Sequence, residues 1–439
     1  MQHHEFVPPR RVRRSIMVGF TAFLFLALLI AILPPDRPIQ LQAQTRLDTR
    51  ETTPTIQPSP VGNGGKAQWT ISQNDLISNF PEGFDFTIDA TSSAGQIVSA
   101  TAYWRHTPSQ IKRVDVKVDS AAPITVSWHP TLGDSVPQWV QIEHWWVLKD
   151  EKGNFYETDH KVDLYEDNTH NWKQAESDDV IVYWEEGIPD QIGQETIDAM
   201  RKRRNFYLQN WGKLLDYRPR VIIYANFQSF DEWDLGIDPP TNGAPTIVGL
   251  TSPEWGGTAQ VYVRKYGTKG VSYGTVLHEV GHLYQFASGG TTGLPGWLYE
   301  GDASYFELIP DYDYVQRVRD MAAVGDLPTL QGIGPAIFGQ NARDGYDIGY
   351  AFFTWLAETY GDNAHLELWT LLAHGKTSTQ ALEIVTGKKF VEMETDFRTW
   401  LGASNPIPPT LRPTRTPQPT EPFEFPPTPT YEPTWTPKP

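Results

Sequence analysis

The chain has 439 residues, of which 39% are hydrophobic and 16 are tryptophan, so it is long enough to bury a sizeable core in two or three domains. Its 53 acidic residues outnumber its 36 basic residues, and a formal net charge of −17 excludes the broad basic surface of a nucleic-acid-binding protein. The absence of cysteine excludes disulfides, thiolate metal sites and cysteine nucleophiles, so any metal ion must be bound by His, Asp or Glu.

The N-terminus has the pattern of a membrane segment. Several arginines precede eighteen uncharged residues from Ile16 to Leu33. A run of this length spans the hydrocarbon core of a bilayer, whereas the apolar part of a cleaved signal peptide is usually about 7–15 residues long. We therefore expect residues 1–33 to be a single-pass anchor in the cell membrane, with the rest of the chain outside the cytoplasm. The alternative is cleavage near Ala43, which would release a secreted protein.

An antiparallel β domain is predicted next. Residues 34–65 have the Pro, Thr, Gln and Gly content of a flexible linker. Residues 66–173 contain alternating runs such as FDFTIDA and WVQIEHWWVL, separated by turn-forming residues at the spacing of an immunoglobulin-like β-sandwich. Its tryptophans either pack in the core, which is the commoner use, or form a carbohydrate-stacking face. They are Trp104, Trp128, Trp139, Trp145 and Trp146.

From about Asp178 the pattern changes to mixed helix and strand. VIVYW and RVIIYA predict two buried strands, with an amphipathic helix over about 190–210 between them, and AQVYV (259–263) predicts a third strand. Most of the remaining sequence predicts helices punctuated by Gly, Pro and Asp. Residues 178–402 are therefore expected to form one α+β domain that combines a mixed sheet with a helical bundle. Residues 403–439 are too rich in proline and threonine to pack, and predict a disordered tail.

One predicted helix contains the polar residues of a metal site. The stretch SYGTVLHEVGHLYQFA, with Ser272 as its expected N-cap, has the pattern HExxH. On a helix, His278 and His282 lie one turn apart on the same face and can present two imidazole nitrogens to one ion. Glu279 projects beside them and can act as a general base on a water. The alternative is a pair of ordinary buried histidines that hydrogen-bond to the backbone.

A third ligand is expected on a second helix, because catalytic zinc has three protein ligands and one open position. The sequence PGWLYEGDASYFELI supplies it, with Pro295 at the helix start and Glu300 as the best candidate ligand. Gly301 lets two helices approach closely. Glu307, seven residues after Glu300, returns to roughly the same face and can orient a ligand from outside. The predicted cofactor is Zn²⁺.

These motifs resemble a known family. HEVGH followed by WLYEGDASYFE is similar to the HExxH and WLxEGxAxYxE motifs of gluzincin metallopeptidases of the aminopeptidase-N type, and residues 180–402 resemble peptidase-MA-like domains in layout. The resemblance implies a zincin-like catalytic domain in which His278, His282 and Glu300 bind zinc and Glu279 is the general base. Asp302 stands where the family often has an apolar residue.

Two further segments were compared with that family. GYDIGYAFFTWLAETYG resembles a family segment whose tyrosine stabilises the oxyanion; Tyr346 matches it, Tyr350 is the second candidate, and an ordinary helix-start tyrosine is the alternative. The GxMEN motif that grips a free amino terminus in the aminopeptidases is missing. We expect that the strand in GGTAQVYV (256–263) can pair with an extended peptide instead, and the missing motif favours endopeptidase action or a narrow substrate.

The sequence thus predicts a membrane-anchored extracytoplasmic zinc metallohydrolase that cleaves a peptide or protein substrate. The alternative is a catalytically inactive, peptidase-like surface protein for binding or adhesion. An inactive protein has no need to keep a general base, so the intact set of ligands together with Glu279 favours the enzyme.

Overall fold

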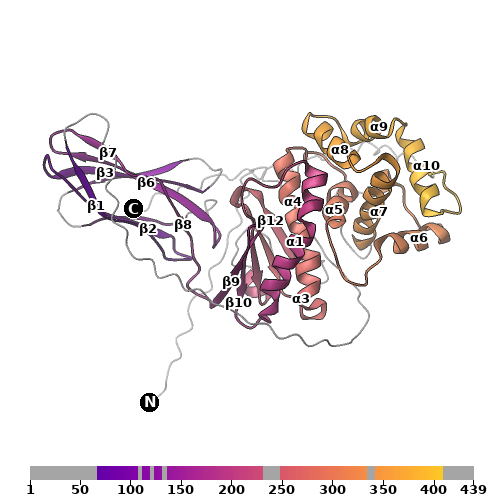
Figure 1. The fold of residues 1–439 in the computed structure, drawn as a ribbon, viewed down its shortest axis with the longest axis horizontal. Helices are drawn as coiled ribbons and strands as arrows, with labels where there is room; N and C mark the ends of the chain where they lie inside the picture. Colours follow the sequence, from indigo (N-terminus) through magenta and orange to yellow (C-terminus); the bar gives the residue numbers. More distant parts are fainter. Residues whose placement is uncertain are drawn as a thin grey trace, which may run out of the picture.

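A computed structural model describes residues 67–106, 111–118, 123–130, 136–230, 248–333 and 342–408 (Figure 1). The predicted anchor (1–33), the linker (34–65) and most of the predicted tail lie outside the described residues. Within the described part, no helix combines the length and apolar character needed to cross a bilayer.

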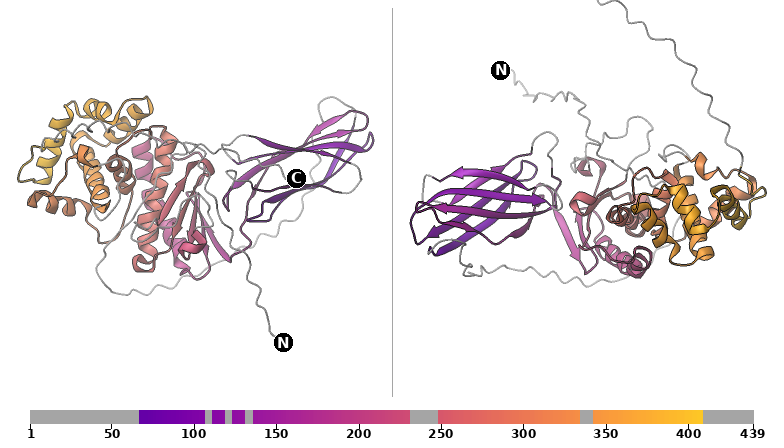
Figure 2. Two further views of the ribbon diagram at one scale, coloured as in Figure 1. Left: turned by 180° about the vertical axis from the view of Figure 1, so that it is seen from behind. Right: turned by 90° about the horizontal axis from the view of Figure 1, so that it is seen from above.

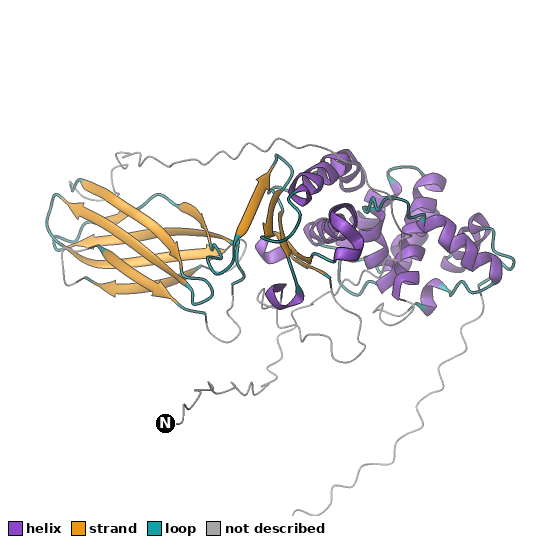
Figure 3. Ribbon diagram, turned by 90° about the horizontal axis from the view of Figure 1, so that it is seen from below, coloured by secondary structure: helices purple, strands orange, loops and turns teal. Residues whose placement is uncertain are grey.

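The first domain is a stack of two antiparallel sheets (Figure 3). One sheet has the order β1 (Trp69–Ser78), β2 (Phe84–Ser92), β5 (Ile124–Trp128). The other has the order β4 (Lys112–Lys117), β3 (Ile97–His106), β6 (Gln141–Asp150), β7 (Phe155–Glu157), and β8 (Lys161–Leu164) also pairs with β6. Alternate residues of both sheets, such as Phe86 and Trp104, are fully buried in one shared core. The two stacked sheets form the expected sandwich, and its immunoglobulin-like classification stays a prediction.

The tryptophans of this domain pack rather than form a sugar-binding face. Trp104 and Trp146 are fully buried in the shared core. Trp145 lies on the outer side of its sheet, but it is buried between Tyr103 and His160, whose ring centroids are 5.4 and 4.1 Å away. Core packing, the commoner of the two uses considered, is therefore confirmed for Trp104 and Trp146, whereas Trp145 is buried by neighbouring rings outside the core.

A mixed sheet stands between the sandwich and the helices (Figure 2). Its order is β12 (Gly249–Ser252), β13 (Gly257–Val261), β11 (Arg220–Tyr224), β10 (Ile181–Glu185), β9 (Trp172–Glu176). The three central strands are parallel and the two outer strands are antiparallel to their neighbours. Every residue of β10 and β11 is buried because helices cover one face and an aromatic cluster around Trp139 covers the other. β9 begins inside the range predicted for the sandwich, so the chain enters the second domain at Trp172.

The expectation that the strand at 256–263 pairs with a peptide is wrong. That strand is β13, which is already paired on one side with β11 and on the other with β12. β12 therefore occupies the edge of the sheet. Its sequence, GLTS, is short and contains glycine, so it lacks the alternating apolar pattern that predicts a strand.

The helices lie mostly on the far side of the mixed sheet (Figure 1), but one short helix, Phe227–Phe230, packs its Phe230 in the aromatic cluster around Trp139 on the opposite face. They are α1 (Gln191–Trp211), α2 (Phe227–Phe230), α3 (Gly267–Gly270), the π-helical segment η4 (Val271–Val276), α4 (Leu277–Ser288), α5 (Gly296–Tyr305), α6 (Tyr314–Val324), α7 (Ala342–Tyr360), α8 (Ala364–Ala373), α9 (Ser378–Thr386) and α10 (Phe390–Leu401). Short 3₁₀ turns are η2 (Pro253–Trp255), η3 (Arg264–Tyr266) and η5 (Leu330–Gly332).

The helix that carries HEVGH starts earlier than expected. Ser272 is not its N-cap, because the π-helical segment η4 and α3 continue the helix upstream. The Ser272 hydroxyl instead lies 2.8 Å from the hydroxyl of Thr196 on α1, fully buried between the two helices.

Two glycines allow α5 and α7 to touch through their backbones. A Cβ at Gly349 would lie 2.2 Å from the carbonyl oxygen of Trp297 and 2.3 Å from the Cα of Gly301. No side chain can occupy that space without moving one helix. Since Gly301 follows Glu300 directly, the same contact fixes the position of the candidate ligand.

This contact predicts the effect of Gly349→Ala. Alanine in a helix is normally favoured over glycine by about 1 kcal/mol, but overpacking costs about 1–3 kcal/mol, and a clash with backbone lies at the upper end. We expect urea denaturation to show a net loss of about 2 kcal/mol or more, whereas Thr359→Ala, an exposed change on the same helix, should have little effect. Unchanged stability would show that α5 and α7 can separate freely.

Candidate metal centre

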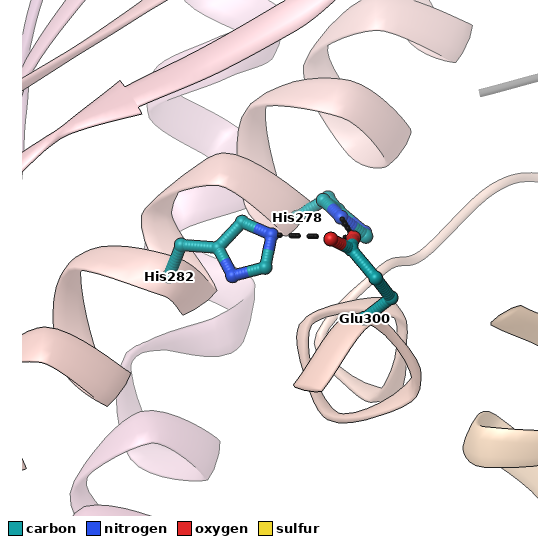
Figure 4. Close-up of side chains that lie close together, drawn as sticks. All are labelled: His278, His282 and Glu300. Carbon is teal, nitrogen blue, oxygen red and sulfur yellow. Dashed lines mark hydrogen bonds and ion pairs between the residues drawn. The ribbon is translucent and has the colours of Figure 1, made fainter. Parts of the chain in front are cut away.

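The candidate ligands meet where α4 packs against α5 (Figure 4). The helices come close because Gly281 has no side chain; a Cβ there would lie 3.2 Å from the Cα of Ala303. His278 and His282 point from α4 toward Glu300 on α5, and one donor atom from each lies within 4.8 Å of the others. All three side chains are buried. Within the described residues, this is the group of His, Asp and Glu side chains arranged to hold a metal ion.

The donor geometry fits a tetrahedral ion. The Glu300 Oε2 atom lies 3.1 Å from His278 Nε2 and 3.5 Å from His282 Nε2. Two ligands bound to zinc at about 2.0–2.1 Å and at tetrahedral angles lie about 3.3 Å apart. The two observed distances lie on either side of this value, and all three donor atoms lie within 4.8 Å of one another, so these side chains can share one zinc ion once the donors move closer together.

A carboxylate orients the first histidine from outside. Glu307 Oε1 lies 2.9 Å from His278 Nδ1, and its other oxygen accepts a hydrogen bond from the Tyr314 hydroxyl. Because an ionised carboxylate only accepts, Nδ1 donates to Glu307, and Nε2, which faces Glu300, is the nitrogen left to bind a metal ion once it has lost its proton. Burial alone would raise the pKa of Glu307, but the charge of Arg343 and the hydrogen bond from His278 hold it below its usual value.

Glu279 lies between α4 and the edge strand β12. Thr251 Oγ1 on β12 donates to Glu279 Oε2 at 2.6 Å, while Oε1 has no hydrogen-bond partner among the described residues. Gly249 provides the space, because a Cβ there would lie 2.5 Å from Oε1. Burial raises the pKa of Glu279, although the neighbouring histidines and Thr251 oppose the shift. A carboxylate with one anchored oxygen, one free oxygen and increased proton affinity suits a general base.

The structure separates the two tyrosine candidates. The buried ring of Tyr346 has its centroid 5.5 Å from that of His278. Tyr350 instead stacks on Tyr314, with ring centroids 4.0 Å apart. Of the two candidates, Tyr346 is therefore the one whose ring contacts a candidate ligand.

Several residues around the site are not among those predicted from the sequence. Thr251 approaches Glu279 from a strand 28 residues earlier, and no local pattern connects the two. Gln285 Oε1 lies 2.7 Å from His282 Nδ1. This pair could have been predicted from the sequence, because residues three positions apart on a helix are neighbours. His365 has no partner at a useful spacing in the sequence, but it is buried and contacts Asp302.

Comparison with known protein families supports a peptidase-like domain. Residues 256–403, which carry α4, α5 and α7, match the model of the Peptidase MA superfamily. No curated protein matches the sequence. Together with the cluster of two histidines and a glutamate, the family match supports a zinc peptidase-like domain.

Three solved structures are similar at low level. The M1 zinc metallopeptidase from Deinococcus radiodurans has 15% identity and a TM-score of 0.32, over 80% of this chain and 97% of that chain. Leukotriene A4 hydrolase from Saccharomyces cerevisiae has 10% identity and a TM-score of 0.26, over 78% and 69%. A polysaccharide deacetylase from Bacillus cereus has 10% identity and a TM-score of 0.18, over 54% and 75%. Structural similarity at these TM-scores does not indicate a function.

Proposed function

We propose that this protein is a zinc metallopeptidase of the gluzincin type that hydrolyses peptide bonds in a peptide or protein substrate. The observation that carries the proposal is the convergence of His278 Nε2, His282 Nε2 and Glu300 Oε2, with the Glu279 carboxylate beside them. The family match over residues 256–403 supports it. The anchor at residues 1–33 and the extracytoplasmic location are proposed from the sequence pattern alone.

The chain's own residues provide the proton transfers. Zinc held by the three ligands would polarise the substrate carbonyl and acidify a water molecule. Glu279 takes the proton from that water at Oε1, since Thr251 holds Oε2, and delivers it to the leaving amine. Tyr346 is proposed to donate from its phenol to the oxyanion.

The edge strand offers a way to hold an extended substrate. β12 ends the mixed sheet within the described residues, and it carries both Gly249 and Thr251 next to Glu279. A peptide that adds to this edge would place backbone carbonyls close to the base. Such binding needs no free amino terminus, which agrees with endopeptidase action.

His278 makes zinc binding dependent on pH. Burial alone would lower the pKa of His278, but hydrogen bonds and charges from Glu300 and Glu307 raise it to about 10 without metal. Because this lies above the unfolded value of about 6.5, protonated His278 stabilises the metal-free fold fully below about pH 6.5, and this contribution is lost as the pH rises through about 10. Zinc binds only the neutral imidazole, so its uptake must expel the proton.

We therefore expect about one proton to be released per zinc bound at about pH 8, and the affinity to rise with pH up to about 10. An indicator dye in weak buffer measures the release, and chelator competition measures the affinity. His374→Gln, an exposed histidine, is the control for general effects on titration. Zinc affinity that is equal at about pH 7 and about pH 9 would contradict the assignment of His278 as a ligand.

The function is tested by metal analysis of the purified protein together with cleavage of a peptide library. One zinc per chain and cleavage that stops on chelation are expected. One zinc per chain without cleavage of any peptide would instead favour the inactive surface-binding alternative. The absence of bound zinc would exclude both the mechanism and the ligand assignment.

A further inference from the structure

A buried glutamine fixes the orientation of the second histidine ligand. Gln285 Nε2 donates to the Tyr299 carbonyl oxygen and to Asp302 Oδ2, both at 2.8 Å, while its Oε1 lies 2.7 Å from His282 Nδ1. The two acceptors determine which end of the amide faces them, so the oxygen must face the histidine. This oxygen only accepts. His282 Nδ1 therefore carries a proton, which leaves Nε2, on the side that faces Glu300, as the nitrogen that can bind a metal ion.

The same hydrogen-bond chain continues beyond the glutamine. Asp302 Oδ1 lies 2.5 Å from His365 Nε2, and His365 Nδ1 lies 2.9 Å from the carbonyl oxygen of Asn210. Asn210 is in the last turn of α1, where carbonyls lack a partner within the helix. The carbonyl only accepts, so His365 Nδ1 donates to it and the ring is fixed at both nitrogens. The C-terminal end of α1 is thus connected to a candidate zinc ligand.

The residues of this hydrogen-bond chain are buried. Gln285 and Asp302 are 0% exposed and His365 is 2% exposed. Aromatic rings surround His365, with the centroid of Trp211 at 4.9 Å and that of Phe353 at 5.4 Å. Burying polar groups among aromatic rings is costly unless each is hydrogen-bonded, and a purely apolar packing would fill the space at lower cost. This costly hydrogen-bond chain therefore needs a functional reason, and its contact with the candidate ligand His282 provides one.

The two histidine ligands have different outer partners. His278 faces a carboxylate, Glu307, directly. His282 faces a neutral amide, and the carboxylate of Asp302 stands one hydrogen bond further away. Gln285 thereby transmits the orientation set by Asp302 and His365 without placing a second negative charge against the ring.

We propose that Asp302 and His365 are positioning residues that act through Gln285 to hold His282 in the metal-binding tautomer, and so set the zinc affinity. This inference rests on the proposed zinc site. It concerns residues outside the group of candidate ligands, since Asp302 reaches His282 through the glutamine.

The test uses the full chain and measures zinc affinity by chelator competition, the visible spectrum of the cobalt(II)-substituted protein, and thermal unfolding without metal. Asp302→Leu and His365→Gln are expected to weaken zinc binding about 10- to 100-fold, the usual effect of losing an outer partner, and to alter the cobalt spectrum. Asp302→Asn keeps an acceptor for Gln285 and should lose less. His374→Gln, an exposed histidine bonded to its own helix, is the control.

A combined variant tests whether the effect passes through the glutamine. Asp302→Leu added to Gln285→Leu should weaken zinc binding no further than Gln285→Leu alone, because the connection is already broken. Losses that add, or a wild-type zinc affinity and cobalt spectrum together with lower thermal stability, would overturn the proposal and leave a purely structural pair. Should Asp302→Leu fail to fold, Asp302→Asn and His365→Gln decide the same question.

The outcomes also separate this inference from the proposed function. If the wild type binds zinc, the variants bind it more weakly and no peptide is cleaved, the peptidase proposal fails and the positioning role stands. If the wild type cleaves peptides and the variants keep full zinc affinity, only the positioning role fails. If His282→Gln binds zinc as tightly as the wild type, both fail.

Discussion

Glu279→Gln should bind zinc with wild-type affinity and lose about 10²- to 10⁴-fold in kcat, the range that a general base contributes. Glutamine has the same shape, and the Thr251 hydroxyl can still donate to its amide oxygen, so the fold should not change. The amide nitrogen would then occupy the place of Oε1, which is the atom proposed to take the proton. Peptide cleavage under saturating substrate, with zinc content measured on the same sample, is the required experiment.

The matched control is Glu367→Gln, which removes one carboxylate from an exposed position on α8. It should cleave peptides like the wild type. Full activity in Glu279→Gln would exclude Glu279 as the base. Loss of zinc from Glu279→Gln would instead show that this carboxylate is a ligand, contrary to its contact with Thr251 on β12.

Glu300→Gln should lose more zinc affinity than any outer-partner variant, that is, more than about 100-fold. It replaces a carboxylate ligand with a weaker, neutral amide and removes the negative charge that lies between the two histidines. Burial alone would raise the pKa of Glu300, but His282 and His278 lower it to about 2, so a charged oxygen is present throughout the neutral range. Glu307→Gln, which changes only the outer partner of His278, should fall between this variant and the wild type.

Thermal unfolding provides an independent measurement of the same effect. Zinc at 100 times its Kd stabilises a folded protein by about 2.7 kcal/mol, so the wild type should show a clear increase in Tm on adding zinc. Glu300→Gln should show almost none at the same concentration. A wild-type increase in the variant would mean that another residue completes the coordination.

Local patterns predicted the parts of the site that lie within one or two helices. The spacing of His278 and His282 follows from the helical turn, and Glu300 follows from the need for a third ligand on a packed neighbour. The structure brings these side chains together as that reasoning required. The tryptophan core and the strands at β10 and β11 likewise follow from runs of apolar residues.

Contacts between distant segments were not predictable in this way. β12 has four residues without a periodic pattern, so the edge of the sheet was assigned to β13. Asp302 and His365 are 63 residues apart, and neither position indicates its partner. Ser272 looked like a cap because serine favours that role, yet a tertiary contact with Thr196 determines its environment.

The candidate ligands come from two differently supported helices. α4 rests on the mixed sheet through β12 and β13, whereas α5 is joined by backbone contact to α7 in the helical bundle. An ion shared by His278, His282 and Glu300 would therefore crosslink the sheet layer and the helical bundle. Catalytic geometry and the cohesion of the whole domain would then depend on the same atom.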